Sequence, residues 1–150
     1  MSWIPTGGMP RRRPEQFSTL LGMAIVRIES TDLGILGDLA QTLANVRAAV
    51  ADALQVPAGD PTVLLVEFPT GHVAMPDGSA EEYVLATVTL FSGRTDQTKR
   101  RLFAALTGAL TAATDAAPTV DIVLHEVPVE NWARDAIPAT ERDLGFRIDI

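Results

Sequence analysis

The sequence of 150 residues contains no cysteine, and aromatic residues make up only 5% of it. Without cysteine, disulfides, thiolate nucleophiles and cysteine-ligated metal sites are excluded. The two histidines, His72 and His125, have no partner at the spacing of a metal site, and no phosphate-binding glycine loop or nucleotide fingerprint occurs. We therefore expect neither a metal ion nor a cofactor.

Positive charge is also scarce, because 12 Lys and Arg residues face 19 Asp and Glu residues, for a net charge of -7. Nucleic-acid binding needs a basic surface. The one basic cluster, Arg11 to Arg13, lies in a proline-rich stretch that indicates a solvated tail. No apolar run is long enough to cross a bilayer. We expect no nucleic-acid or membrane partner, and a cytoplasmic protein as the simplest case.

An internal repeat is the most informative feature that is present. Val63 to Pro69 reads VLLVEFP, and Ile122 to Pro128, 59 residues later, reads IVLHEVP. Each segment is an apolar run that ends in Glu, one apolar residue and Pro, and each follows a helix-like pattern and a proline-containing turn. Such a repeat indicates that one supersecondary unit has been duplicated.

Hydrophobic periodicity predicts the elements of each unit. Apolar runs predict strands at about Ala24–Glu29, Val63–Phe68, Tyr83–Phe91 and Ile122–Val127. Steps of three and four predict a first helix with Leu36, Leu39, Leu43, Val46, Val50 and Leu54 on one face. A second helix, capped by Thr95 or Asp96, has an apolar face of Leu102, Phe103, Leu106, Leu110 and Ala113. We also expect a short closing strand near Phe146–Ile150.

This order predicts an α+β fold with two β-α-β units, at about residues 24–69 and 83–128. They lie in a domain of residues 23–150, after a flexible extension of residues 1–22. Right-handed crossovers place both helices on one face of a four-stranded mixed sheet. The other face is then bare and apolar, which a soluble chain tolerates poorly. We expect self-association to cover it, most simply in a closed ring.

Two segments in the second unit resemble a known family. Ser92 to Lys99, SGRTDQTK, lies between a strand and a helix, and Glu126 to Trp132 reads EVPVENW. These motifs are similar to those of the tautomerase superfamily, and the likeness extends from about Met23 to Ile137. The long two-unit members include malonate semialdehyde decarboxylase and cis-3-chloroacrylic acid dehalogenase. The resemblance implies a homotrimer that acts on a small carboxylated keto, enol or unsaturated acid, with decarboxylase-type lyase chemistry as one form.

The resemblance also implies a catalytic proline with a free amine at the start of the first strand. Ala24 stands at that place, and 23 residues precede it, so its nitrogen is an ordinary amide here. A chain starting at Ala24 would carry a primary amine with a pKa of about 8, which can act as a weak base or form a Schiff base. Pro10, in the pair Met9-Pro10, is a poor substitute because Arg11 to Arg13 and another proline follow it.

Other site residues follow from the resemblance. It implies that Arg94 holds the substrate carboxylate, since a guanidinium can donate two hydrogen bonds to it. Asp60, after a Val-Pro-Ala turn, matches a catalytic aspartate, although aspartate is common in turns. Trp132 matches a pocket aromatic, or it packs at a subunit interface. His72 lies opposite Trp132 in the repeat, near an equivalent pocket, whereas His125 interrupts an apolar strand and is expected to be a core histidine.

Two functions remain open. The chain is either an enzyme of the tautomerase type with weak or absent proline-dependent activity, or a catalytically silent trimeric scaffold or binding protein of the same fold. The internal position of Ala24 favours the silent protein. The retained turn around Arg94 favours a working carboxylate pocket.

Overall fold

The computed structural model describes residues 24–76, 82–112, 114–115 and 117–150. The expected extension of residues 1–22, with its basic cluster and Met9-Pro10, lies outside the described residues, as do Met23 and Ala113.

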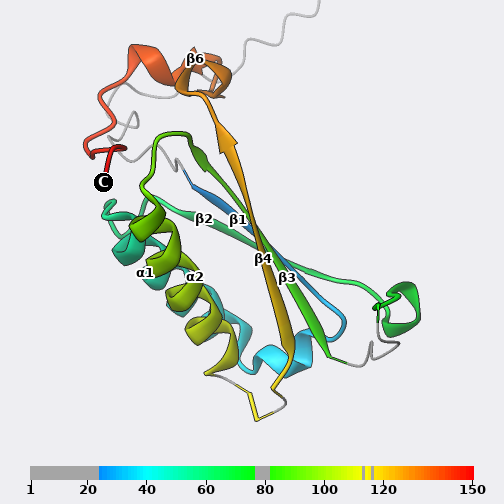
Figure 1. The fold of residues 1–150 in the computed structure, drawn as a ribbon. Coiled ribbons are helices and arrows are strands. Elements are labelled where there is room, and N and C mark those ends of the chain that lie inside the picture. Colours follow the sequence, from blue (N-terminus) through cyan, green and yellow to red (C-terminus); the bar gives the residue numbers. More distant parts are fainter. Residues whose placement is uncertain (1–23, 77–81, 113, 116) are drawn as a thin grey trace, which may run out of the picture.

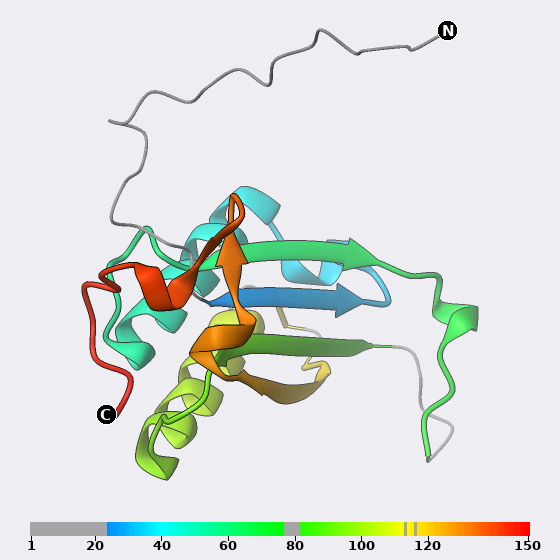
Figure 2. The ribbon, with the colours of Figure 1, turned by 90° about the horizontal axis from the view of Figure 1, so that it is seen from above.

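The core of the fold is a four-stranded sheet with two helices on one of its faces (Figure 1). Its strands are β1 (Ile25–Ser30), β2 (Thr62–Glu67), β3 (Tyr83–Phe91) and β4 (Thr119–Val127), in the order β2-β1-β3-β4. β1 is parallel to β2 (Figure 2) and β3 is parallel to β4, while the central pair β1 and β3 is antiparallel. Each parallel pair is connected through a helix, α1 (Leu39–Leu54) or α2 (Asp96–Thr111). The expected duplicated β-α-β fold with a mixed sheet is therefore confirmed.

The helices begin at side-chain caps. The side chain of Asp38 accepts a hydrogen bond from the Gln41 amide, and Thr95, not Asp96, caps α2 by accepting one from the Thr98 amide. The first helix starts later than its apolar pattern suggests. Leu36 belongs to a short 3-10 helix (Leu33–Leu36), because Gly37, at φ 70°, turns the chain before the cap.

Alternation along the strands divides their side chains between the helix side and the opposite face. The buried core on the helix side contains Val26, Ile28, Val46, Val50, Leu54, Val84, Ala86, Val88, Leu90, Leu102, Leu106 and Leu110. Phe103 was expected with them, but its side chain is 38% exposed. Each helical residue is turned by about 100° from the one before it, so Phe103 cannot share the direction of the buried Leu102.

The sheet face opposite the helices is uncovered in the protomer, and we call it the open face. Two of its apolar side chains, Leu64 and Val123, are 45% and 46% exposed. The face also carries charge, since Arg27 and Glu29 form an ion pair at 3.3 Å. His125 lies on this face and is exposed, so the expectation of a core histidine is wrong. Strand alternation directs its neighbour Leu124 toward the core instead.

A hydrogen bond joins two strands on the open face. The Tyr83 hydroxyl donates to Asp121 Oδ2 at 2.7 Å. Burial, followed by this bond to the carboxylate, raises the pKa of Tyr83 from 10.0 to about 12.

Tyr83 is the one tyrosine of the sequence, so its ionisation can be followed by ultraviolet absorbance. We expect a midpoint near pH 12 in the folded protein, and Asp121→Asn should move it downward. Because the pKa is raised on folding, the stabilisation is complete below about pH 10 and is lost as the pH rises toward 12. A native midpoint near 10 would contradict the partly buried, hydrogen-bonded phenol.

The C-terminal region differs from its expected structure. Residues 146–150 form no strand. Instead β5 (Ala133–Arg134) pairs with β6 (Ile137–Pro138) in a hairpin, between short 3-10 helices at Val129–Asn131 and Ala139–Glu141. Asp135 and Ala136, both at positive φ, form its tight turn. Phe146 and Ile148 pack by their side chains on Phe91 and Ala139, which explains why their alternation does not produce a strand.

No helix among residues 24–76, 82–112, 114–115 and 117–150 is both long and apolar enough to span a membrane.

Candidate functional site

Four of the predicted site residues lie at the same end of the sheet, which we call the site end. The parallel strands β1 and β2 both begin there, just after Ala24 and Asp60. Because β3 and β4 run in the opposite direction, both end there, just before Arg94 and Trp132. Topology alone therefore gathers residues that are more than one hundred positions apart in the sequence.

Ala24 is a buried residue at this end, with 1% of its surface exposed. Its carbonyl oxygen accepts a hydrogen bond from the Thr62 amide at 2.8 Å, which extends the pairing of β1 with β2. In this chain its nitrogen belongs to the peptide bond with Met23. An amide nitrogen is neither a base nor a nucleophile at neutral pH, so it has no catalytic capacity while that bond is intact.

Arg94 is nearly buried, with 7% of its surface exposed. Its Nη1 donates to the Leu54 carbonyl at 2.7 Å, at the negative end of the α1 dipole. The centre of its guanidinium lies 5.6 Å from the ring centre of Phe146. Its Nε is buried and has no hydrogen-bond partner among the described residues. One donor of a buried guanidinium is therefore unsatisfied, which is costly unless a ligand pairs with it.

Electrostatics link Arg94 to Asp60. Burial lowers the pKa of Arg94 from its ordinary value, and the negative charge of Asp60 opposes that shift. The guanidinium stays charged, since arginine does not lose its proton in proteins. Asp60 is itself 1% exposed, and its amide donates to the Pro57 carbonyl at 2.9 Å in the turn before β2. A buried carboxylate thus lies near a buried cation, as expected for charges away from water.

Trp132 lines a hollow of about 260 Å³ on the open face at the site end. The other lining residues are Ile25, Thr89, Val127, Asn131 and Ala133. The Trp132 ring meets Phe91 edge to face, with ring centres 5.1 Å apart. Arg94 is not among the lining residues. The structure therefore brings Trp132 and Arg94 to the same end and connects them through the apolar cluster of Phe91 and Phe146, but not into one cavity.

His72 does not join the others within one protomer. It lies in a short 3-10 helix (Thr70–His72) after the carboxyl end of β2, and its side chain is exposed. Since β2 begins at the site end, His72 lies beyond the opposite end of the sheet (Figure 1). Within one chain it is too far along the sheet to assist Arg94.

The sequence did not indicate the part played by residues 144–150. Leu144, Phe146 and Ile148 pack on the cluster at the site end, and Ile150 accepts a hydrogen bond from the Thr95 amide at 2.9 Å. Gly93, at φ 113°, lies so close to this segment that an added Cβ would come within 3.1 Å of Ile148. The backbone angle calls for a glycine, and the contact leaves little room for a Cβ. In the sequence, the alternating apolar residues of this segment could have indicated that one side of it packs on the rest of the domain.

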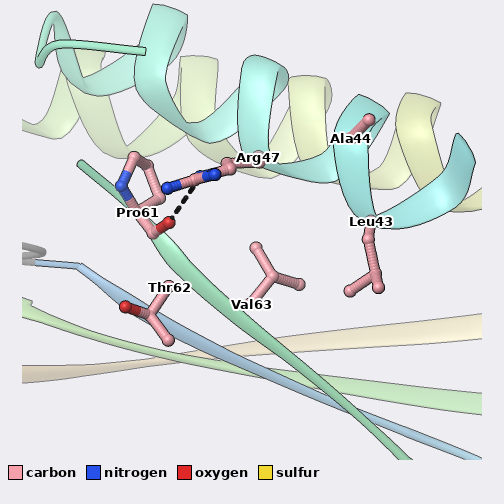
Figure 3. Close-up of a pocket in the computed structure, with 6 residues that line it drawn as sticks. All are labelled: Leu43, Ala44, Arg47, Pro61, Thr62 and Val63. Atoms are coloured by element: carbon pink, nitrogen blue, oxygen red, sulfur yellow. Dashed lines mark hydrogen bonds between the residues drawn. The ribbon is translucent and has the colours of Figure 1, made fainter. Parts of the chain in front are cut away.

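A larger hollow, of about 430 Å³, lies between α1 and the edge strand β2 (Figure 3). Its lining is Leu43, Ala44, Arg47, Pro61, Thr62 and Val63. Its one charged group is already engaged, because Arg47 Nε donates to the Pro61 carbonyl at 2.9 Å. The described part of the chain also holds no group of three or more His, Asp or Glu residues placed for a metal ion. We therefore assign the candidate site to the site end.

Comparison with protein families decides the relationship. A family model described as tautomerase enzyme matches residues 60–134, half of the chain. The chain belongs to the tautomerase superfamily. The match includes Asp60, His72, Arg94 and Trp132 but not Ala24, so the first strand of this tautomerase-superfamily protein lies outside it. Among curated protein sequences none matches significantly.

Solved structures share the tautomerase fold. The protein Pt0534, inactivated by 2-oxo-3-pentynoate, is 27% identical with a TM-score of 0.69, over 77% of this chain and 96% of its own. FG41 malonate semialdehyde decarboxylase, inhibited by 3-bromopropiolate, is 26% identical with a TM-score of 0.62, over 77% of this chain and 92% of its own. A fused 4-OT asymmetric trimer, at 22% identity over 77% of this chain and 96% of its own, has a TM-score of 0.69 and supports the fold alone.

Proposed function

We propose that this tautomerase-superfamily protein binds a small carboxylated keto, enol or unsaturated acid at the site end. The observation that carries this proposal is the buried Nε of Arg94, which lacks a partner among the described residues. A carboxylate is the ligand that best satisfies a guanidinium donor, through short, charge-assisted hydrogen bonds. Small unsaturated carboxylates also inactivate or inhibit two similar proteins, 2-oxo-3-pentynoate in one and 3-bromopropiolate in the other.

Each residue has a proposed role. Arg94 holds the ligand carboxylate, and Asp60 orients the guanidinium and activates or orients a water molecule. Trp132 lies at the same end but lines a separate hollow, so it contacts the carbon part of the ligand only if binding or assembly joins that hollow to Arg94. The Ala24 nitrogen transfers protons in a keto–enol reaction only in a chain that begins at Ala24, because only there is it an amine. In the longer chain this chemistry is weak or absent.

A second candidate function is a catalytically silent binding protein or scaffold. The observation that favours it is Ala24, whose nitrogen is an amide in the chain described here. Both functions share the proposed carboxylate pocket, and they differ in whether a free amine acts on the bound ligand.

The proposed form of the protein is a cytoplasmic homotrimer. Exposed Leu64 and Val123 on the open face support it, because large apolar side chains there gain by burial against sister copies. Several solved structures with this fold are described as trimers. His72 contributes to the site only if assembly places it beside the site end of a neighbouring copy.

Calorimetric titration with 2-oxopentanoate tests the role of Arg94. We expect Arg94→Ala to weaken binding about tenfold to a hundredfold, since a hydrogen bond to a charged group contributes about 1.5–3 kcal/mol. Arg94→Lys keeps a cation for the Leu54 carbonyl but cannot donate two parallel hydrogen bonds to the ligand carboxylate. This variant should therefore also bind 2-oxopentanoate weakly. Because Arg94 supports α1 as well, the thermal midpoint of each variant is measured in parallel.

Two controls make the titration specific. Arg100→Ala removes an exposed arginine of α2 and should leave the affinity unchanged. The uncharged ligand 2-pentanone should bind wild type and Arg94→Ala equally weakly. Unchanged affinity of a folded Arg94→Ala chain for 2-oxopentanoate would refute the proposed carboxylate site.

A further inference from the structure

Residues Leu144–Ile150, which we call the strap, cross the site end without forming a helix or strand. In Figure 1 this red segment lies beside the nearer ends of α1 and α2. Its apolar side chains Leu144, Phe146 and Ile148 pack inward on the cluster around Phe91. Arg147 and Asp149 form an ion pair at 2.9 Å with both side chains mostly exposed. The strap therefore has an apolar inner side and a charged outer side.

Three strap residues contact three consecutive residues just before α2. Phe146 lies over the guanidinium of Arg94 at 5.6 Å. Ile148 lies so close to Gly93 that a Cβ would come within 3.1 Å of it. The Ile150 carbonyl accepts from the Thr95 amide at 2.9 Å, the one main-chain hydrogen bond described between the strap and the rest of the chain. The strap is thus held over Arg94 mainly by side chains.

The strap and a carboxylate would use different parts of the same guanidinium. An aromatic ring attracts a cation through the face of its π system, whereas a carboxylate binds the edge of a guanidinium, where the N–H groups point. The Arg94 Cζ lies over the Phe146 ring at 5.6 Å from its centre, Leu54 takes Nη1, and Nε is unpaired among the described residues. The ring therefore attracts the cation without using an N–H donor and does not compete for the donor that remains.

We propose that the strap is a cover over the carboxylate site, and that Phe146 is a positioning residue which aligns Arg94 for its ligand. This proposal rests on the proposed function of Arg94. Since Arg94 is only 7% exposed beneath the strap, the strap opens when a carboxylate enters and closes behind it. Phe146 then increases affinity by holding the guanidinium and slows exchange by blocking the path.

Chemical labelling of arginine tests the cover without any ligand. Phenylglyoxal modifies accessible arginines, and peptide mass spectrometry reports the rate for each one. In wild type we expect slow modification of Arg94 and fast modification of the exposed Arg100. Phe146→Ala should raise the Arg94 rate at least tenfold and leave the Arg100 rate unchanged, whereas Phe146→Tyr, which keeps the ring, should behave as wild type. An Arg94 rate that is the same in wild type and folded Phe146→Ala would overturn the cover.

Ligand kinetics test the positioning role. Stopped-flow mixing with 2-oxopentanoate should show faster association for Phe146→Ala together with a severalfold loss of affinity. Phe146→Leu keeps apolar bulk over the site but not the aromatic face, so it should lose affinity without faster association. Circular dichroism identifies any variant that fails to fold, and Phe146→Leu and Phe146→Tyr then decide the question.

The two experiments separate the inference from the function on which it rests. If no chain binds 2-oxopentanoate, the proposed function and the positioning role are both wrong, and the labelling rates still decide whether the strap is a cover. If wild type binds but substitutions of Phe146 change neither labelling, association nor affinity, the function stands and the strap proposal is wrong.

Discussion

A chain that begins at Ala24 should convert phenylenolpyruvate to its keto form at least about a hundredfold faster than the chain that keeps residues 1–23, the usual minimum contribution of a positioned acid–base group. Removal of the peptide bond changes the Ala24 nitrogen from an amide into a primary amine with a pKa of about 8. Because only the unprotonated amine accepts a proton, the rate should rise with pH through this value. Initial rates measured by absorbance test both expectations.

Covalent labelling provides a second measurement for the same chain. The acetylenic ketone 2-oxo-3-pentynoate reacts with free amines by conjugate addition, so intact mass should show one adduct at Ala24 of the trimmed chain. A chain that begins at Met23 is the matched control, because it has a free amine displaced by one residue and should be slow in both assays. Ala24→Pro in the trimmed chain should be faster still, since it supplies a secondary amine. Equal rates for full-length and trimmed chains would show that this nitrogen takes no part.

Val123→Asp should convert a trimer into single chains of 16.0 kDa. Val123 lies in one row of the open face with Leu64, Arg27 and Thr87, and its side chain is 46% exposed in the protomer. If sister copies bury this row, an unpaired carboxylate placed there costs several kcal/mol, which is enough to dissociate the assembly. Light scattering after size-exclusion chromatography measures the mass of each form.

Phe103→Asp is the matched control for the assembly. It introduces the same charge at another exposed apolar residue, but on the helix side of the molecule, so the trimer should persist. Wild type that elutes as a single chain would refute the trimer. A Val123→Asp variant that remains trimeric would place the interface on another surface.

The fold was predictable because its determinants are local patterns. The apolar steps of the helices and the alternation of the strands specify each unit, and the repeat specifies their arrangement. The errors have the same physical origin. In the apolar run before His125 the residues at odd and at even positions are equally apolar. The sequence therefore does not reveal that the Leu124 side chain points toward the core and that of His125 toward the open face. The alternation of Phe146 and Ile148 likewise does not reveal that the segment packs on distant residues and pairs with no strand.

The sequence predicted which residues belong to the candidate site, but not the contacts that they make. The motif around Arg94 and the turn before Asp60 indicated chemistry, and the topology places them at one end. The bond from Arg94 to Leu54, its contact with Phe146 and the unpaired Nε depend on segments 40 and 52 positions away in the sequence, which no local pattern encodes. The separation of His72 from this end follows from strand direction alone.

The bond between Arg94 and the last turn of α1 has a consequence for the history of such proteins. This guanidinium links the turn before α2 to the end of α1, so it stabilises the fold whether or not a ligand is bound. Selection for a stable chain would therefore preserve this arginine in descendants whose chemistry has been lost. Retention of the motif would then be evidence of ancestry, and under the proposed function the state of the Ala24 nitrogen decides whether the protein is catalytic.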